Sequence, residues 1–141
     1  MTRIFLDSDI LLDVLTGRLP FSRDAVAVFT LIENKRISGF ASSLSFSNLY
    51  YVLRKYASHA RVIKSLGKLA ELIGILNVDE SVVKMALSSG FRDFEDALQC
   101  FSAQTHPEIE LIVTRNIKDF QKCELPVMTP ETFLKTIQQF E

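Results

Sequence analysis

The chain has 141 residues, of which 48% are hydrophobic, and its formal net charge at pH 7 is −1. The hydrophobic content excludes a disordered chain, and the near-neutral charge excludes a protein that coats nucleic acid through its global charge. The length predicts a single domain over residues 1–141.

The first predicted element is a short buried strand over residues 4–6, which ends at Asp7. An unbroken apolar run between polar residues is typical of a strand that is covered on both faces. Asp9 is expected to cap a helix over residues 10–16, and Gly17 is expected to end it. The chain therefore begins with a strand that leads directly into a helix.

Helices and strands alternate along the rest of the chain, and Pro20 is expected to begin the second helix. The predicted helices cover residues 20–35, 44–57, 61–73, 79–90, 93–105 and the segment after Thr129. The other predicted strands cover residues 37–41, 75–78, 111–113 and, as an edge strand, 126–128. This alternation indicates an α/β fold with a mostly parallel sheet.

The few cysteines and histidines form no metal-binding pattern. Cys100 and Cys123 lack ligand spacing, and His59 and His106 lie far apart. The cysteines are therefore expected to be reduced thiols of a cytoplasmic protein. We expect no membrane segment, because no uninterrupted apolar stretch approaches the roughly 20 residues that span a bilayer.

Acidic and amide residues fall where a ligand site is expected. Asp7 follows the first strand, Asn116 follows the strand over 111–113, and Asp93 and Asp96 start the helix "DFEDALQCFSA". In open α/β sheets, ligands bind beyond the carboxyl ends of the strands. If the two strands are neighbours, these groups converge on one cleft. Clustered carboxylates repel one another unless a cation neutralises them, and oxygen ligands favour Mg²⁺ or Mn²⁺.

Three segments resemble motifs of the PIN-domain family, which includes the VapC-type toxins of bacterial toxin–antitoxin pairs. "IFLDSDILLDVL" resembles the opening of the family, "DFEDALQCFSA" its third motif and "LIVTRNIKDF" its fourth. The resemblance extends from Arg3 to Phe120. It implies a three-layer α/β/α sandwich around a central parallel sheet, with a ribonuclease site that depends on Mg²⁺ or Mn²⁺.

The resemblance also assigns individual residues. Asp7 matches the first acid of the family and Asp96 the third. The second acid position, in the helix after the second strand, is held by Asn48, and the fourth, after Thr-Arg, by Asn116. Two of the four expected carboxylates are therefore amides, which removes about two negative charges from a site that binds its metal mainly through charge. Thr114 is expected to hold a water molecule or an acid in place.

Nearby acids are candidates to compensate, and these are Asp93, Glu95, Asp9 and Asp119. Asp93 is favoured, because it precedes Asp96 by three residues and so lies on the same side of a helical turn. Several residues also have an ordinary structural interpretation. These are Asp9 as a helix cap, Asp93 as an N-cap, Asn116 as the cap of a helix over 117–120, Asn48 as a half-inward helix residue, and Asp13 as a solvated or paired surface acid.

A basic face is predicted on the helix over 61–73, where Arg61, Lys64 and Lys68 lie on one side. Such a face is usually only solvated. If it borders the acidic cleft, it would hold RNA phosphates while the cleft performs the chemistry.

The leading prediction is a metal-dependent endoribonuclease, in which water bound to Mg²⁺ or Mn²⁺ attacks a phosphodiester of single-stranded RNA. Asp7 and Asp96 would ligate the metal, and Asp93 and Asn116 would complete the shell or orient water. The resemblance adds a toxin role, an antitoxin partner and a homodimer. The alternative is a non-catalytic PIN fold that binds RNA or protein.

Overall fold

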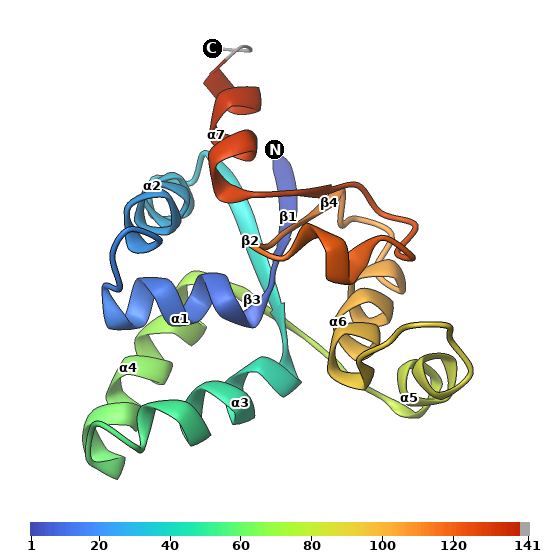
Figure 1. The fold of residues 1–141 in the computed structure, drawn as a ribbon. Coiled ribbons are helices and arrows are strands. Elements are labelled where there is room, and N and C mark those ends of the chain that lie inside the picture. The colour runs from blue at the N-terminus through green and yellow to red at the C-terminus, as the bar shows by residue number, and fades with distance from the viewer. Residues whose placement is uncertain (139–141) are drawn as a thin grey trace.

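The computed structural model describes residues 1–138, which form a parallel sheet between two layers of helices (Figure 1). Within this range the sheet has five strands in the order β3-β2-β1-β4-β5, and every pair of neighbours is parallel. The strands are β1 (Thr2–Leu6), β2 (Ile37–Ser42), β3 (Gly74–Leu76), β4 (Leu111–Val113) and β5 (Val127–Met128). The predicted strand positions and the edge position of the last strand are confirmed.

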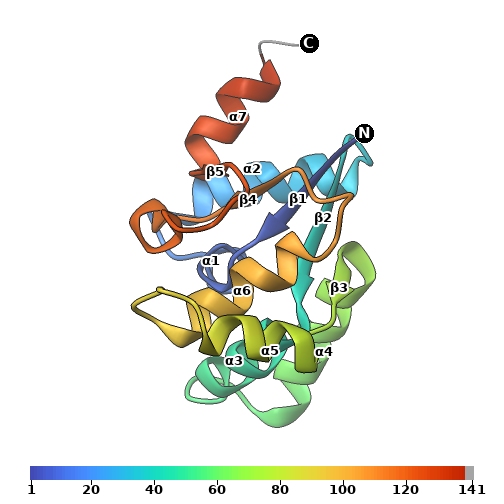
Figure 2. The same ribbon diagram turned by 90° about the vertical axis from the view of Figure 1, so that its right-hand side faces the viewer.

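Helices cover both faces of the sheet. They are α1 (Ser8–Thr16), α2 (Ser22–Glu33), α3 (Ser43–Leu53), α4 (His59–Leu72), α5 (Glu80–Leu87), α6 (Phe94–Gln104), α7 (Pro130–Gln138) and the short 3₁₀ helix η1 (Ile117–Phe120). Figures 1 and 2 show α1 to α4 on one side of the sheet and α5 and α6 on the other.

The side chains of β1 explain the two layers, because successive residues of a strand point to opposite faces. Ile4 and Leu6 are fully buried in a core shared with α1, α2 and α4. Phe5, between them, is fully buried in a second core with Cys100 of α6 and Phe120 of η1. The three-layer α/β/α sandwich expected from the sequence is confirmed.

The start of the first two helices differs from the prediction. Asp7, not Asp9, is the N-cap of α1: its backbone is extended (φ −68°, ψ 157°) and its carboxylate accepts a hydrogen bond from Ser8 N. The Asp9 carboxylate is bound instead by the segment after β4. Pro20 follows a cis peptide bond in a turn, and α2 begins two residues later at Ser22. The predicted end of α1 at Gly17 is confirmed, with Gly17 in the left-handed region (φ 64°).

A disulfide joins Cys100 to Cys123, whose Cα atoms are 5.9 Å apart. The prediction of two reduced thiols was wrong, because the fold brings together residues that are 23 positions apart. The bond connects α6 to the segment that follows η1. As for the predicted absence of a membrane segment, no helix within residues 1–138 has the length and apolar character needed to cross a bilayer.

Candidate functional site

The carboxyl ends of β1 and β4 meet at one edge of the sheet. This is the arrangement under which a common cleft was expected from the sequence. Leu6, which ends β1, is paired with Val113, which ends β4. Asp7 and Thr114 follow these ends, and Thr114 Oγ1 donates a hydrogen bond to Asp7 Oδ2 at 2.8 Å. Thr114 is fully buried and Asp7 is 6% exposed. The carboxylate of the first predicted acid is therefore held in one orientation by the neighbouring strand.

Asp7 is strongly perturbed by its surroundings. Burial, followed by the negative charge of Asp9, raises the pKa of Asp7 from its ordinary value of 3.8 to about 8. Hydrogen bonds from Thr114 and Ser8 act in the opposite direction, and the charge of Asp96 adds to the increase. A positively charged ligand would remove this penalty, because it favours the ionised carboxylate.

Asp9 connects α1 to the segment after β4. Its Oδ2 accepts hydrogen bonds from Arg115 N at 3.1 Å and from Asn116 Nδ2 at 3.3 Å. Thr114 Oγ1, which donates its one proton to Asp7, lies 3.3 Å from the same oxygen. Its Oδ1 is buried and has no partner among the described residues. A buried acceptor without a partner is costly, and it is the kind of atom that a bound cation or water would satisfy. Burial, the largest cause, raises the pKa of Asp9 as well.

The side chain of Asn116 serves Asp9 and makes no capping hydrogen bond to η1. Asn116 is thus the N-cap residue of η1 by position, as predicted, but its amide binds the carboxylate of Asp9 instead of capping the helix. This places Asn116 beside the acids, in the position that the resemblance assigned to a fourth carboxylate.

The second half of the site lies at the start of α6. Asp93 is the N-cap, as the structural interpretation predicted, and its Oδ1 accepts a hydrogen bond from Asp96 N at 2.9 Å. Partial burial, followed by the charges of Asp93 and Asp119, raises the pKa of Asp96 from 3.8 to about 7. The charge of Asp9 also contributes to this increase. Asp7, Asp9 and Asp96 therefore form one electrostatic cluster.

Two cavities open beside this cluster. One, of about 410 Å³, is lined by residues of both signs, which include Asp93, Asp96, Lys118, Asp119 and Lys122. The other, of about 500 Å³, is lined by residues of α1, α3 and α6, which include Ser8, Asp9, Asn48, Tyr51 and Glu95. Asn48, at the position matched to the second acid, thus shares a cavity with Asp9.

The donor set suits a hydrated magnesium or manganese ion. Within residues 1–138, no group of three or more His, Cys, Asp or Glu side chains is arranged so that it could hold a metal ion. Mg²⁺ is commonly held by one or two carboxylates and several water molecules, so a closed cage is not required. The unpartnered Oδ1 of Asp9 and the raised pKa values of Asp7 and Asp96 fit such an ion.

A buried polar network, which the sequence did not reveal, lies beneath this site. Gln99 is fully buried on α6 and accepts a hydrogen bond from Ser42 Oγ at 2.7 Å. Its Nε2 donates to Ser45 Oγ at 3.0 Å and to Ser8 Oγ at 3.2 Å. The network ties α6 to the starts of α1 and α3. No local signal marked Gln99, because α6 also carries other polar residues, which include Gln104 and the buried Ser102.

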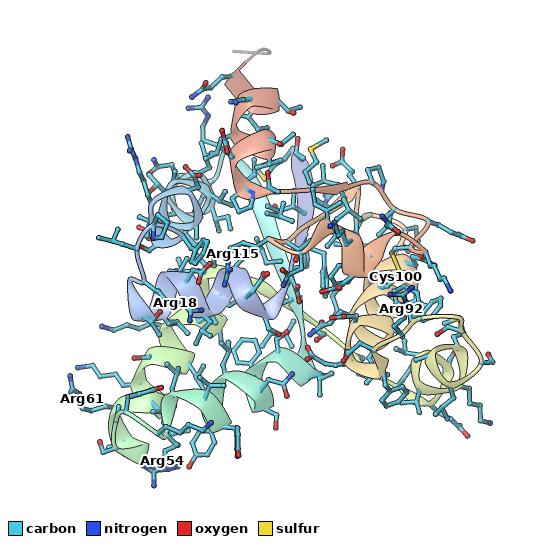
Figure 3. All side chains as sticks on the ribbon, in the orientation of Figure 1. Arg18, Arg54, Arg61, Arg92, Cys100 and Arg115 are labelled. Atoms are coloured by element: carbon cyan, nitrogen blue, oxygen red, sulfur yellow. A yellow bond between two sulfur atoms is a disulfide. The ribbon has the colours of Figure 1, made fainter. Side chains whose placement is uncertain are left out.

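A buried ion pair supports the same region. Asp13 is fully buried, so the prediction that it lies on the surface was wrong. The prediction that it is paired is confirmed. Arg115 Nε lies 2.7 Å from Asp13 Oδ2, and Arg18 Nη2 lies 3.5 Å from Asp13 Oδ1. The guanidinium of Arg115 also stacks on the Phe21 ring at 3.9 Å. Figure 3 shows Arg115 and Arg18 beside α1.

The predicted basic face is on α4, and none of its three residues lines either of the two cavities beside the acids. Arg61, Lys64 and Lys68 are exposed on α4. Arg61 and Arg18 line an apolar groove of about 550 Å³ between α1, α3 and α4. Figure 3 shows Arg61 and Arg54 at the far end of α4 and α3. Leu12 and Val52 line both this groove and the cavity that contains Asp9 and Asn48, so the two are adjacent.

Solved structures with this fold are toxin–antitoxin proteins. VapBC2 from Rickettsia felis, bound to a promoter DNA fragment, aligns with 16% identity and a TM-score of 0.66 over 91% of this chain and 98% of that one. A toxin–antitoxin complex from Klebsiella pneumoniae aligns with 24% identity and a TM-score of 0.67 over 90% and 97%. VapC20 from Mycobacterium tuberculosis, a toxin that cleaves the sarcin–ricin loop, aligns with 16% identity and a TM-score of 0.59 over 77% and 86%.

No curated protein matches the sequence at a significant level. The family model of the PIN domain matches residues 3–118, which is most of the chain and includes Asp7, Asn48, Asp96 and Asn116. The resemblance seen in the sequence is therefore confirmed, and the chain belongs to the PIN domain family.

Proposed function

We propose that the chain, as a single PIN domain over residues 1–141, is a metal-dependent endoribonuclease that hydrolyses single-stranded RNA as the toxin of a toxin–antitoxin pair. The observation that carries this proposal is the convergence of Asp7 and Asp96 at the edge of the sheet where ligands bind, where the negative charge of Asp96 makes ionisation of the Asp7 carboxyl more costly. The sarcin–ricin loop cleavage of VapC20 supports an RNA substrate.

Each residue has a separate task in this proposal. A bound Mg²⁺ or Mn²⁺ would neutralise phosphate charge and lower the pKa of a water molecule, so that water becomes a nucleophile near neutral pH. Asp7 and Asp96 would hold the ion. Thr114 would keep Asp7 oriented through its 2.8 Å hydrogen bond, and Asn116 would do the same for Asp9. Asp93 would fix the start of α6 and add negative charge beside Asp96.

The proposal is tested by replacing the two acids with amides. Asp7→Asn and Asp96→Asn are expected to lower cleavage of a labelled single-stranded RNA by roughly 100-fold or more, because each removes charge that positions the ion. Asn is also a good N-cap, so Asp7→Asn should keep α1 intact. Asp24→Asn, in the first turn of α2, is the matched control and should cleave at the wild-type rate. Wild-type cleavage by Asp7→Asn would refute the proposal.

A non-catalytic module that binds RNA or protein is the second candidate function. The amides at positions 48 and 116, together with the lack of a three-ligand group within residues 1–138, favour it. Calorimetry with Mn²⁺ separates the two functions. Failure to bind Mn²⁺ at millimolar concentration would support the module, whereas binding that is lost in Asp7→Asn supports the enzyme.

The groove between α1, α3 and α4 is the proposed site of an antitoxin segment. It is lined by Leu12, Leu15, Leu53 and Val62, and Arg18 and Arg61 lie at its polar rim. This chemistry fits an amphipathic segment with apolar and acidic residues. Leu53→Asp should abolish binding of the proposed antitoxin, which we expect to be a small protein encoded beside this gene. The complexes formed by the solved neighbours support this partner.

The RNA contacts and the oligomeric state remain predictions. Arg61, Lys64 and Lys68 are proposed to bind RNA phosphates, so their replacement by Ala should reduce the salt dependence of RNA affinity by roughly one charge each. A homodimer is proposed for the free toxin in the cytoplasm, and light scattering after size exclusion would measure its mass.

A further inference from the structure

Asn48 is a neutral amide at the position where the resemblance expects a negatively charged side chain. A carboxylate from another helix lines the same cavity. Glu95, on the first turn of α6, lines the cavity of about 500 Å³ together with Asn48, Asp9 and Ser8. Two different helices, α3 and α6, thus present their side chains to one space beside the acids.

One hydrogen bond joins the carboxylate of the exposed Glu95 to a buried residue of the same helix. Gln99 Nε2 donates to Glu95 Oε1 at 3.3 Å, and the two residues are one helical turn apart. Gln99 is itself fixed, because it is fully buried and accepts a hydrogen bond from Ser42 Oγ at 2.7 Å. The exposed Glu95 side chain is therefore tied at one oxygen to the buried network, and Oε2 is the oxygen that we assign to a ligand.

Glu95 lies close enough to act on the acids of the site. Its negative charge is one of the causes that raise the pKa of Asp96. Its cavity also contains Asp9, whose Oδ1 is buried without a partner among residues 1–138. The cavity is thus lined by two carboxylates and an amide, whose oxygens are donors for a hard divalent cation.

Asp93, which the sequence favoured as the compensating acid, is placed differently. Its Oδ1 is occupied as the N-cap of α6. It lines the other cavity, together with Asp119, Lys118 and Lys122. The two lysines supply positive charge there, whereas neither lysine lines the cavity of Asn48. Asp93 and Asp119 are therefore poorly placed to replace the charge missing at position 48.

We infer that Glu95 of α6 provides the second acid of the metal site, in place of the amide Asn48 of α3, and that Gln99 holds its carboxylate in position. This inference rests on the proposed function and assigns one residue within it. It makes α6 the source of two neighbouring acids of one metal site, Glu95 and Asp96, at the point where the helix begins.

A charge exchange between the two positions tests the inference without measuring catalysis. Calorimetry would give the Mn²⁺ affinity of the full chain, and Glu95→Gln should weaken it by roughly 10- to 100-fold. Asn48→Asp, combined with Glu95→Gln, should restore the affinity to within a few-fold of the wild type, because the negative charge returns to the same cavity. Glu71→Gln, on the exposed surface of α4, is the matched control and should bind Mn²⁺ as the wild type does.

The outcomes separate this inference from the proposed function. If Asp7→Asn loses Mn²⁺ and Glu95→Gln does not, the proposed function stands and the role of Glu95 is overturned. If Glu95→Gln weakens binding and Asn48→Asp fails to restore it, Glu95 acts through the fold and not through its charge, which also overturns the inference. If neither Asp7→Asn nor Glu95→Gln changes Mn²⁺ binding, both the proposed function and the role of Glu95 are overturned.

Discussion

The two halves of the candidate site are built differently. In the buried half, Asp7, Asp9 and Asp13 of the first strand and helix are held by Thr114 and Arg115 from the end of β4. In the open half, Asp93, Asp96 and Asp119 line a cavity of about 410 Å³ with Lys118 and Lys122. In the buried half, hydrogen bonds join the acids to Thr114 and Arg115. In the open half, the acids mainly repel one another.

This difference assigns separate physical roles to the halves. A buried carboxylate that accepts several hydrogen bonds loses little freedom when a ligand binds, so the buried half is preorganised. Repelling acids beside a cavity gain most from a cation, so the open half responds to one. Stability should therefore depend most on the buried half, and ligand binding should change the open half more.

The largest expected effect comes from breaking the buried ion pair. Arg115→Ala would leave Asp13 fully buried with only Arg18, at 3.5 Å and half exposed, as a partner. Removing one member of a buried pair costs roughly 3 to 5 kcal/mol, because an uncompensated charge remains. Urea denaturation should show a loss of about 3 kcal/mol in the free energy of unfolding.

Arg92→Ala is the control from the open half, since Arg92 is an exposed residue that lines the cavity there (Figure 3). It should change the free energy of unfolding by less than about 0.5 kcal/mol. Replacing both members of the pair, by Asp13→Leu with Arg115→Met, should recover part of the loss, because no charge is left buried. Equal effects of Arg115→Ala and Arg92→Ala would contradict the division into halves.

The next effect is a pH dependence of folding stability, which should come more from the buried half than from the open half. The pKa of Asp7 is raised to about 8 and that of Asp96 to about 7, from 3.8 in the unfolded chain. Between pH 4 and pH 8 the unfolded chain has released protons that the folded protein still binds, so the stability contributed by these groups falls as pH rises and levels off above pH 8. The buried Asp7 should account for most of a decrease on the order of 3 kcal/mol.

Mn²⁺ should oppose this trend. Metal ligands must be deprotonated, so the affinity for Mn²⁺ should rise with pH until about pH 8, and Mn²⁺ should stabilise the protein most at high pH. Denaturation at several pH values, with and without Mn²⁺, measures both effects. In Asp7→Asn the pH-dependent loss should shrink, and an unchanged profile would show that Asp7 is not the titrating group.

A third prediction concerns the covalent bond of the open half. The Cys100–Cys123 disulfide connects α6 to the segment after η1 across 23 residues, so its reduction should lower the free energy of unfolding by about 3 kcal/mol. Denaturation with and without a phosphine reductant measures the loss, and the double variant Cys100→Ala with Cys123→Ala should be insensitive to reductant. Two free thiols in the untreated protein would contradict the bond.

The sequence predicted the parts of the fold that depend on local pattern. The apolar runs of β1 and β4, the Asp93 cap and the Pro130 start of α7 are local signals, and the structure confirms them. The neighbouring positions of β1 and β4, which bring Asp7 and Thr114 together, were a condition of the expected cleft, and the structure meets that condition.

The sequence failed where a side chain has a distant partner. Asp9 resembles a cap until Arg115 and Asn116 are placed beside it, and Asp13 resembles a surface acid until Arg115 reaches it. Gln99 gave no local signal, because its partners lie on β2, α1 and α3. These contacts join residues far apart in the chain, and no local periodicity encodes them.

The smallest expected effect isolates one hydrogen bond of the buried half. Thr114→Val keeps the shape of the side chain and removes the donor to Asp7 Oδ2, which costs about 1 kcal/mol of stability. Because this hydrogen bond lowers the pKa of Asp7, its loss should raise that pKa further and weaken Mn²⁺ binding at pH 7. Thr114→Ser retains the hydroxyl and should preserve the affinity. If Val and Ser variants bind Mn²⁺ equally well, the hydroxyl does not position the carboxylate, and the buried half is preorganised by its backbone alone.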